Sequence, residues 1–110
     1  MSKYGAQKIT VNGITFDSKR EAYRWHELRL LERGKVIKDL RRQVKFELLP
    51  SQKYKGELAE RGVSYIADFV YTDIRTGAFI VEDAKGARTK EYILKRKMML
   101  YFHGIRIKEV

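Results

Sequence analysis

The chain has 110 residues, which suits one compact domain, and it contains no cysteine, which excludes disulfide bonds and thiolate metal sites. Its 24 Lys and Arg residues outnumber its 14 Asp and Glu residues, and the net charge of +10 favours a polyanionic partner, with nucleic acid as the first candidate. Because no apolar run approaches the roughly 18 residues that span a bilayer and residues 1–9 lack a signal-peptide core, we expect a cytoplasmic protein with no membrane partner.

A hairpin and a helix are the first predicted elements. Residues 8–11 and 14–16 contain β-branched residues on both sides of an Asn-Gly pair, which favours a type I′ turn. Ser18 and Glu21 have the spacing of a capping box and Gly34 is a natural stop, so we predict a helix from Ser18 to about Gly34. Its expected buried stripe is Ala22, Trp25, Leu28 and Leu31.

Three strands, a second helix and a last strand follow. Alternating or apolar runs and terminal glycines predict strands at 42–49, 64–72 and 78–85, a helix at 90–103 and a strand at 105–110. Residues 51–62 are polar and predict an exposed loop, and residues 73–77 predict a short hairpin turn. We therefore expect one domain, residues 1–110, of the α/β (α+β) class, in which a mixed central sheet carries helices packed against it.

Two carboxylates and a lysine at neighbouring strand ends are the strongest functional signal. Asp68 lies near the end of one predicted strand, and Asp83 and Lys85 share a face of the next because side chains alternate along a strand. Glu82 falls on the opposite face and is not chosen as a ligand. Two carboxylates and an amine in this arrangement can hold a hard divalent cation and place a water beside it.

Structural roles are the alternative for each of these residues. Asp68 could instead form a salt bridge at a strand end, and Asp83 and Lys85 could form a solvated ion pair. Glu21 fits the capping box, and it could also reach the same site as a further ligand from the first helix.

Basic residues around the second helix are the candidates for contacts with DNA phosphates. Lys95 falls among apolar residues of the helix, where it could snorkel or reach toward the site. The expected DNA-binding residues are Lys19, Arg88, Lys90, Lys95, Arg96 and Lys97.

The order of elements and several short motifs resemble the PD-(D/E)xK nuclease superfamily, which has a restriction-endonuclease-like fold with a core of αβββαβ. Residues 16–22, Gln43, 65–69, 83–86 and 95–97 look like a family of small uncharacterised proteins encoded largely by phages and prophages. The resemblance assigns residues 18–110 to the core and residues 1–17 to an added N-terminal hairpin. Two positions depart from the superfamily pattern: Ala67 stands where its name has proline, and Asp83 is shorter than the more frequent glutamate.

The resemblance implies a role for each matched position. Asp68 and Asp83 would bind Mg²⁺, for which Mn²⁺ would substitute, and the carbonyl of Ala84 would be a further ligand. Lys85 would orient or activate the attacking water, and Glu21 matches an acid that many members carry on the first helix. The implied function is a DNA endonuclease, similar to Holliday-junction resolvases, that acts in phage DNA recombination, repair or processing inside a bacterial cell.

Two consequences follow for partners and for rival functions. A resolvase cuts two strands symmetrically, so that substrate would require a twofold homodimer. The main rival is a non-catalytic DNA-binding protein in which the same acids and amine form a structural ion-pair cluster. RNA binding is less favoured, because it would require exposed stacking aromatics whereas most aromatic residues here alternate as if buried.

Overall fold

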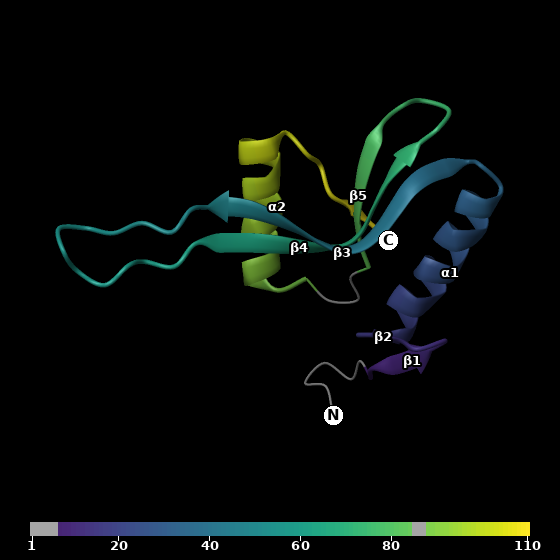
Figure 1. Cartoon of the computed structure of the whole chain (residues 1–110), viewed down its shortest axis with the longest axis horizontal. Coiled ribbons are helices and arrows are strands. Elements are labelled where there is room, and N and C mark those ends of the chain that lie inside the picture. Colours follow the sequence, from purple (N-terminus) through teal and green to yellow (C-terminus); the bar gives the residue numbers. More distant parts are fainter. Residues whose placement is uncertain (1–6, 85–87) are drawn as a thin grey trace.

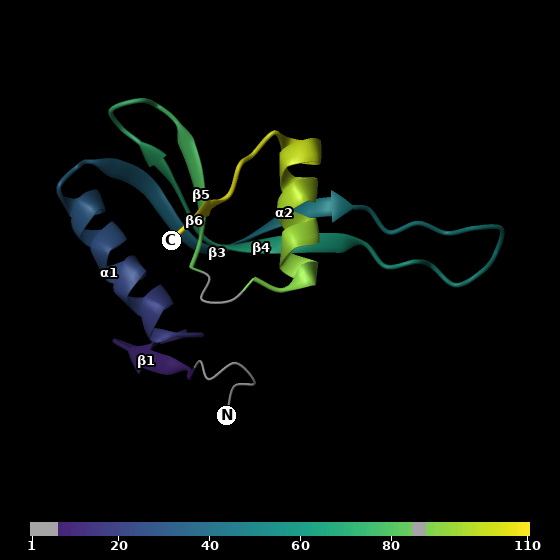
Figure 2. The same cartoon turned by 180° about the vertical axis from the view of Figure 1, so that it is seen from behind.

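The computed structural model describes residues 7–84 and 88–110, and its element order confirms the predicted one. The elements are β1 (Ile9–Val11), β2 (Ile14–Phe16), α1 (Lys19–Arg33), β3 (Ile37–Leu49), β4 (Val63–Asp73), β5 (Phe79–Asp83), α2 (Lys90–His103) and β6 (Lys108–Glu109). The β1–β2 hairpin stands apart from a mixed four-stranded sheet of order β3-β4-β5-β6, in which β3–β4 and β4–β5 pair antiparallel and β5–β6 pair parallel (Figures 1 and 2). Within the described residues, no helix has the length and apolar character needed to cross a membrane.

Two strands differ in length from their predictions. β3 begins at Ile37 rather than residue 42, because a register shift between Lys38 and Arg41 interrupts the alternation on which the prediction depended. Asp39 lies within this shift and has a positive φ of 56°. β6 is shorter than predicted: only residues 108 and 109 pair with β5, while Ile107 is buried just before them.

Helix α1 begins and ends as its sequence predicts. The Ser18 side chain accepts a hydrogen bond from the Glu21 amide at 3.2 Å, and Gly34 ends the helix. Leu28 is fully buried and Trp25 and Leu31 are partly buried, so this part of the expected stripe faces the core. The helix also buries Glu21, and this burial brings the acid toward the sheet.

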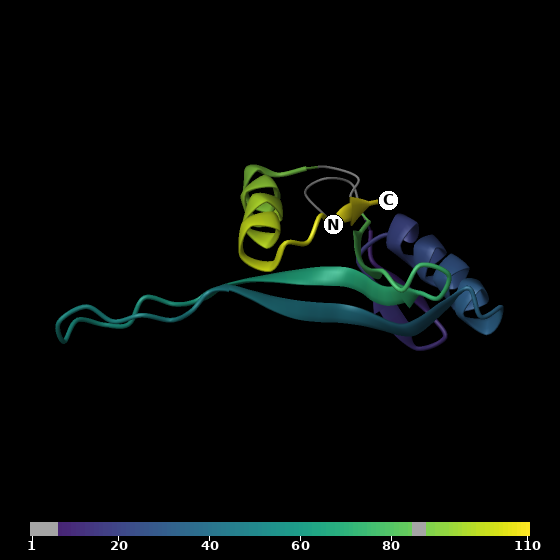
Figure 3. The same cartoon turned by 90° about the horizontal axis from the view of Figure 1, so that it is seen from above.

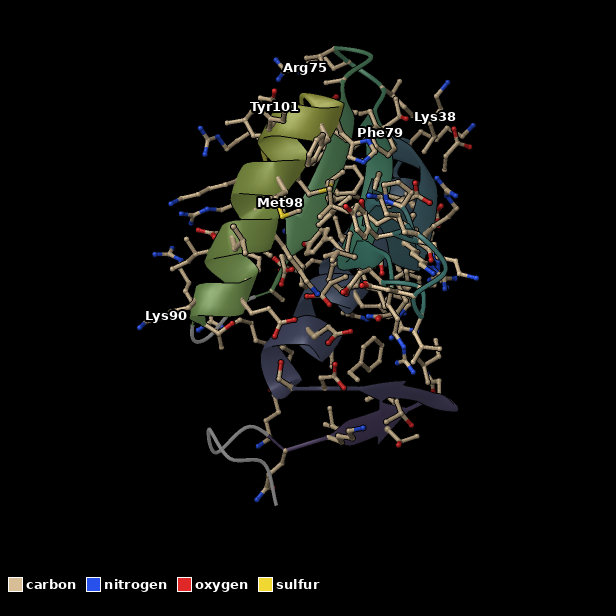
Figure 4. All side chains as sticks on the ribbon, turned by 90° about the vertical axis from the view of Figure 1, so that its left-hand side faces the viewer. Lys38, Arg75, Phe79, Lys90, Met98 and Tyr101 are labelled. Carbon is tan, nitrogen blue, oxygen red and sulfur yellow. The ribbon has the colours of Figure 1, made fainter. Side chains whose placement is uncertain are left out.

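The two helices cover different parts of the sheet and build separate cores. Leu28 of α1 packs with Phe69 and Tyr71 of β4, whereas Met99 of α2 packs with Val70 and other residues of a second cluster. Figures 1 and 3 show α1 and α2 at different positions along the β3–β4 ribbon, which continues well beyond α2. In Figure 4, Met98 points from α2 toward the sheet, whereas Lys90 points away from the first turn of the helix.

A buried ion pair connects α1 to β5. Arg24 donates two hydrogen bonds to the carboxylate of Glu82, at 2.8 and 2.7 Å, and Tyr71 donates a further one. Glu82 is fully buried, and the paired carboxylate raises the pKa of Arg24 above its already high value. Because a buried carboxylate without its partner is costly, this pair holds α1 against the sheet.

We expect Arg24→Leu to lower the free energy of unfolding by about 3 kcal/mol or more, because it leaves the Glu82 carboxylate buried without its main partner. Urea unfolding followed by circular dichroism measures the change. Arg29→Leu is the matched control: Arg29 is on the same helix but exposed, with Glu32 3.7 Å away, and its loss should cost less than about 1 kcal/mol. Equal losses for both variants would contradict this role of Arg24.

Candidate active site

Asp68 lies at the point along β4 where the inward-facing side chains pass from the core under α2 to the core under α1. Arg42 pairs with Phe69 and Val44 pairs with Ala67, and between them Gln43 adopts a positive φ of 52°. Asp68 therefore lies beside an irregular point in the backbone of β3. The register of the two strands does not shift at this point, so the departure from regular strand geometry is confined to the backbone of Gln43.

The alternation expected for β4 is wrong at this point. The sequence pattern places Tyr65, Ala67 and Phe69 on one face, away from Asp68. In the structure Tyr65 and Ala67 pack in the α2 core, whereas Phe69 packs in the α1 core. The twist and the irregularity at Gln43 account for the change, because strict alternation describes only a regular strand.

Asp83 lies near Asp68 because of the pairing between β4 and β5. Phe69 is opposite Glu82 in this antiparallel pair, so the next positions along it, Asp68 and Asp83, are neighbours. The Ala84 amide donates a hydrogen bond to Asp68 Oδ2 at 2.8 Å. Glu82 faces α1 as expected from parity, since Arg24 binds it there. The two acids chosen from the sequence therefore lie side by side, but the prediction that both are at strand ends is wrong for Asp68, which lies in the middle of β4.

Tyr65 orients the second of these acids. Its hydroxyl donates to Asp83 Oδ2 at 2.5 Å, and Asp83 is almost fully buried. Burial, followed by the neighbouring Asp83 carboxylate, raises the pKa of Tyr65, so the hydroxyl keeps its proton and remains a donor. One oxygen of Asp83 is thereby fixed in position.

Glu21 reaches the same region from α1. The amide nitrogen of Gln43 lies 3.3 Å from Glu21 Oε1 and 3.4 Å from Asp68 Oδ1, so one side chain connects both acids. Glu21 Oε2 also accepts from the Asp17 amide at 3.3 Å, and Arg42 approaches Oε1 at 3.5 Å. Glu21 thus takes part in the capping of α1 and also contacts Gln43 at the candidate site.

The clustering of acids changes their protonation. Burial, followed by the charge of Asp83, raises the pKa of Asp68 from 3.8 to about 7, and Glu21 adds to this effect. The hydrogen bond from Ala84 acts in the opposite direction but is outweighed. Burial also raises the pKa of Glu21. A cation bound between these carboxylates would offset the repulsion that raises the pKa of Asp68.

The donor chemistry fits a hard cation held by few protein ligands. Within residues 7–84 and 88–110, no three His, Asp or Glu side chains are grouped closely enough to hold a metal. Mg²⁺, however, is commonly bound by one or two carboxylates together with waters and phosphate oxygens. Asp68 and Asp83 meet that requirement, and Glu21 would act through water. Lys85, the expected water-orienting amine, lies outside the described residues.

The predicted DNA-binding residues divide into two groups. Lys19, Lys90 and Lys97 are exposed. In contrast, Arg88 and Arg96 both contact Glu109, at 2.9 and 3.1 Å. Lys95 lies 3.1 Å from Glu91 on the same helix. To bind a DNA phosphate, each residue of the second group would have to give up its carboxylate partner. The exposed lysines of the first group could bind a phosphate directly.

Sequence reasoning missed Tyr65 and Arg42 as neighbours of the acids and gave Gln43 no role. Gln43 is a polar residue on the wet face of its strand, and only the β3–β4 register places it beside Asp68. Arg42 lies over the Phe16 ring, 4.6 Å from its centre, and approaches Glu21 from there. A register prediction for β3 and β4 would have identified Gln43. The contact of Tyr65 with Asp83 depends on the change of face and leaves no signal in the sequence.

We expect the wild-type protein to lose stability relative to Asp68→Asn as the pH rises from 4 to 7. The folded protein holds a proton on Asp68 up to a pKa of about 7, whereas the unfolded chain releases it near 3.8, so the stabilising effect is complete below pH 4 and is lost through pH 7. Thermal melts across this range should show a relative loss on the order of 1–3 kcal/mol. Glu57→Gln, an exposed acid, is the control, and parallel profiles for wild type and Asp68→Asn would contradict the prediction.

Comparison with known proteins gives a family and no function. The model of one protein family, described as "Protein of unknown function (DUF1064)", matches residues 1–109. No curated protein and no solved structure matches the chain. Since the match covers nearly all of the sequence, the chain belongs to the DUF1064 family.

Proposed function

We propose that this protein is a Mg²⁺-dependent DNA endonuclease that hydrolyses phosphodiester bonds and selects its substrate by DNA structure. The observation that carries the proposal is the approach of acids from three elements: Gln43 contacts both Glu21 of α1 and Asp68 of β4, and Asp83 at the end of β5 is the neighbour of Asp68. Acids that are paired for structural reasons alone would be expected to have cationic partners, as Glu82 has in Arg24. Within residues 7–84 and 88–110, the charged groups that act on Asp68 are the acids Asp83 and Glu21.

Asp68 and Asp83 would hold the cation, the Ala84 carbonyl would be a further ligand, and Glu21 would contribute through water. When bound, Mg²⁺ would polarise a phosphate oxygen and lower the pKa of a coordinated water. Mn²⁺ would substitute, because it has a similar preference for oxygen ligands. Asp68 must lose its proton to act as a ligand, so the reaction would slow as the pH falls below about 7.

The other residues would position the groups that react. Tyr65 fixes one oxygen of Asp83, and Gln43 fixes Asp68 relative to Glu21. Lys85, as in the resemblance to PD-(D/E)xK nucleases, would orient the attacking water and offset charge as the transition state forms. The net charge of +10 would attract the DNA backbone, with an affinity that falls steeply with salt.

Recognition of DNA shape suits a domain of this size. A chain of 110 residues offers little surface for reading a base sequence, so branched or junction DNA is the proposed substrate. Phage DNA recombination, repair or processing in the bacterial cytoplasm is the proposed setting. If the substrate is a four-way junction, a homodimer is part of the proposal, because two symmetric cuts need two sites.

A non-catalytic DNA-binding protein is the second candidate, and one observation favours it. Oδ2 of Asp83 accepts from Tyr65, and Oδ2 of Asp68 accepts from the Ala84 amide. Both acids thus have partners within the protein, as they would in a structural cluster. Metal binding distinguishes the two candidate functions, because only the nuclease requires a cation at these acids.

We expect Asp83→Asn and Lys85→Ala to reduce cleavage at least about 100-fold, because each removes a group that acts on the reacting phosphate or its water. The assay is a panel of single-stranded, duplex, flap, fork and four-way junction DNA with Mg²⁺ or Mn²⁺. Glu27→Gln, an exposed acid on α1, is the matched control and should cleave like wild type. Unchanged cleavage by both site variants would show that the acids and Lys85 are not the catalytic site.

We expect Mg²⁺ or Mn²⁺ to raise the melting temperature of the wild-type protein but not of Asp68→Asn/Asp83→Asn. At a metal concentration ten times the dissociation constant, the gain is about 1.4 kcal/mol. Differential scanning fluorimetry at pH 8, where Asp68 is ionised, measures the shift. No shift, together with no nicking in Mn²⁺, would favour the non-catalytic alternative.

A further inference from the structure

The β3–β4 ribbon continues into an arm, residues 50–62, that projects from the body of the protein. Figure 3 shows this arm extending past α2 and away from α1. All of its residues are exposed, including Leu58 at 94% and Tyr54 at 63%. The longest dimension of the molecule, 54 Å, reflects this projection. The prediction of an exposed loop was therefore correct in exposure but missed the extended shape.

The arm has a defined form. The backbones of Gln52 and Glu60 exchange two hydrogen bonds, at 3.0 and 2.6 Å, so the two chains run as a narrow antiparallel pair. At its base, a Cβ added to Gly62 would lie 2.8 Å from the Leu49 carbonyl oxygen, so the close approach of the chains requires glycine. The arm is thus a preformed ribbon.

The side chains of the arm are exposed and do not pack in the hydrophobic core. Leu58 and Tyr54 face water, where apolar surface is unfavourable, and an isolated two-stranded ribbon is only marginally stable. The arm also carries the basic residues Lys53, Lys55 and Arg61 and the acids Glu57 and Glu60, so its net charge is 3 − 2 = +1. Apolar and basic groups on a thin projection suit insertion beside a polyanion better than packing against this domain.

We propose that the arm lies in the major groove of duplex DNA about one helical turn from the cleaved phosphate. This inference rests on the proposed function, because the distance is measured from Asp68. The major groove, about 12 Å wide, admits a two-stranded ribbon. Leu58 precedes Asp68 by ten positions, which spans up to roughly 33 Å in extended chain, close to the ~34 Å of one duplex turn.

A hollow lies between the site and the base of the arm. It has a volume of about 350 Å³ and is lined by residues of β4 and the start of α2, among them Ser64, Tyr65, Thr89 and the Glu91–Lys95 pair. Ser64 and Tyr65 lie along β4 between Gly62 and Asp68. The duplex backbone would follow this hollow from the acids toward the arm, where Lys53, Lys55 and Arg61 contact phosphates.

Photocrosslinking tests where the tip lies. The chain has no cysteine, so Leu58→Cys and, as control at the other end of the ribbon, the half-exposed Val36→Cys each accept one benzophenone-maleimide label. With Ca²⁺ in place of Mg²⁺ and a 30-base-pair duplex or branched DNA, we expect adducts from the Leu58 position about ten base pairs from the cut mapped with Mg²⁺. Adducts only to a second protein chain, or none above the Val36 control, would overturn the proposal.

A charge-matched pair of variants tests the phosphate contacts. Lys53→Ser/Lys55→Ser/Arg61→Ser should reduce the slope of log affinity against log salt by about 2–3. The control Lys35→Ser/Lys38→Ser/Arg75→Ser removes the same charge from exposed positions at the other end of the ribbon, two of which are labelled in Figure 4. Equal slopes for the two variants would overturn the arm contact. DNA crosslinking from the Leu58 label without any cleavage by wild type would support the arm contact and reject the nuclease.

Discussion

The pairing of β4 with β5 is the constraint on which the candidate site depends. With Phe69 opposite Glu82, the acids at 68 and 83 must be neighbours. A shift of one residue would reverse the faces of β5 and would bring Glu82 to the site in place of Asp83. The Arg24–Glu82 pair opposes such a shift, because it would bury Asp83 against α1 and leave Arg24 without its carboxylate. The ion pair that attaches α1 to β5 therefore also keeps Asp83, rather than Glu82, beside Asp68.

The adjacent carboxylates on β5, Glu82 and Asp83, have different hydrogen-bond partners and different neighbouring charges. Glu82 and Asp83 are both buried. Arg24 and Tyr71 donate hydrogen bonds to Glu82, and Tyr65 donates one to Asp83, which lies beside Asp68. The first arrangement neutralises charge within the protein. In the second, burial and then the neighbouring charge of Asp83 raise the pKa of Asp68. The proposed cation would lie at the second place, where it would lower the pKa of Asp68.

The proposed DNA path connects three parts of the molecule that have different mechanical properties. The acids are supported by strands and by Tyr65 and Gln43, so their geometry is fixed by packed elements. Lys90 and Lys97 stand on the outer part of α2 as mobile point charges. The arm is a thin ribbon with no core of its own, which suits adjustment to a groove rather than precise chemistry. Under the proposed function, the residues that capture and position DNA would thus be separate from those that catalyse its cleavage.

The sequence by itself determined the order of the elements, the helix ends at Ser18, Gly34 and Gly104, and the choice of Asp68 and Asp83 as neighbouring acids. These features depend on local chemistry: capping, glycine conformation and the period of apolar residues. Tertiary structure alone decided the start of β3, the change of face along β4, the contact between Tyr65 and Asp83 and the extended arm. Each of those depends on strand register and on backbone irregularities, which are set by partners distant in the chain and leave no periodic pattern in the residues themselves.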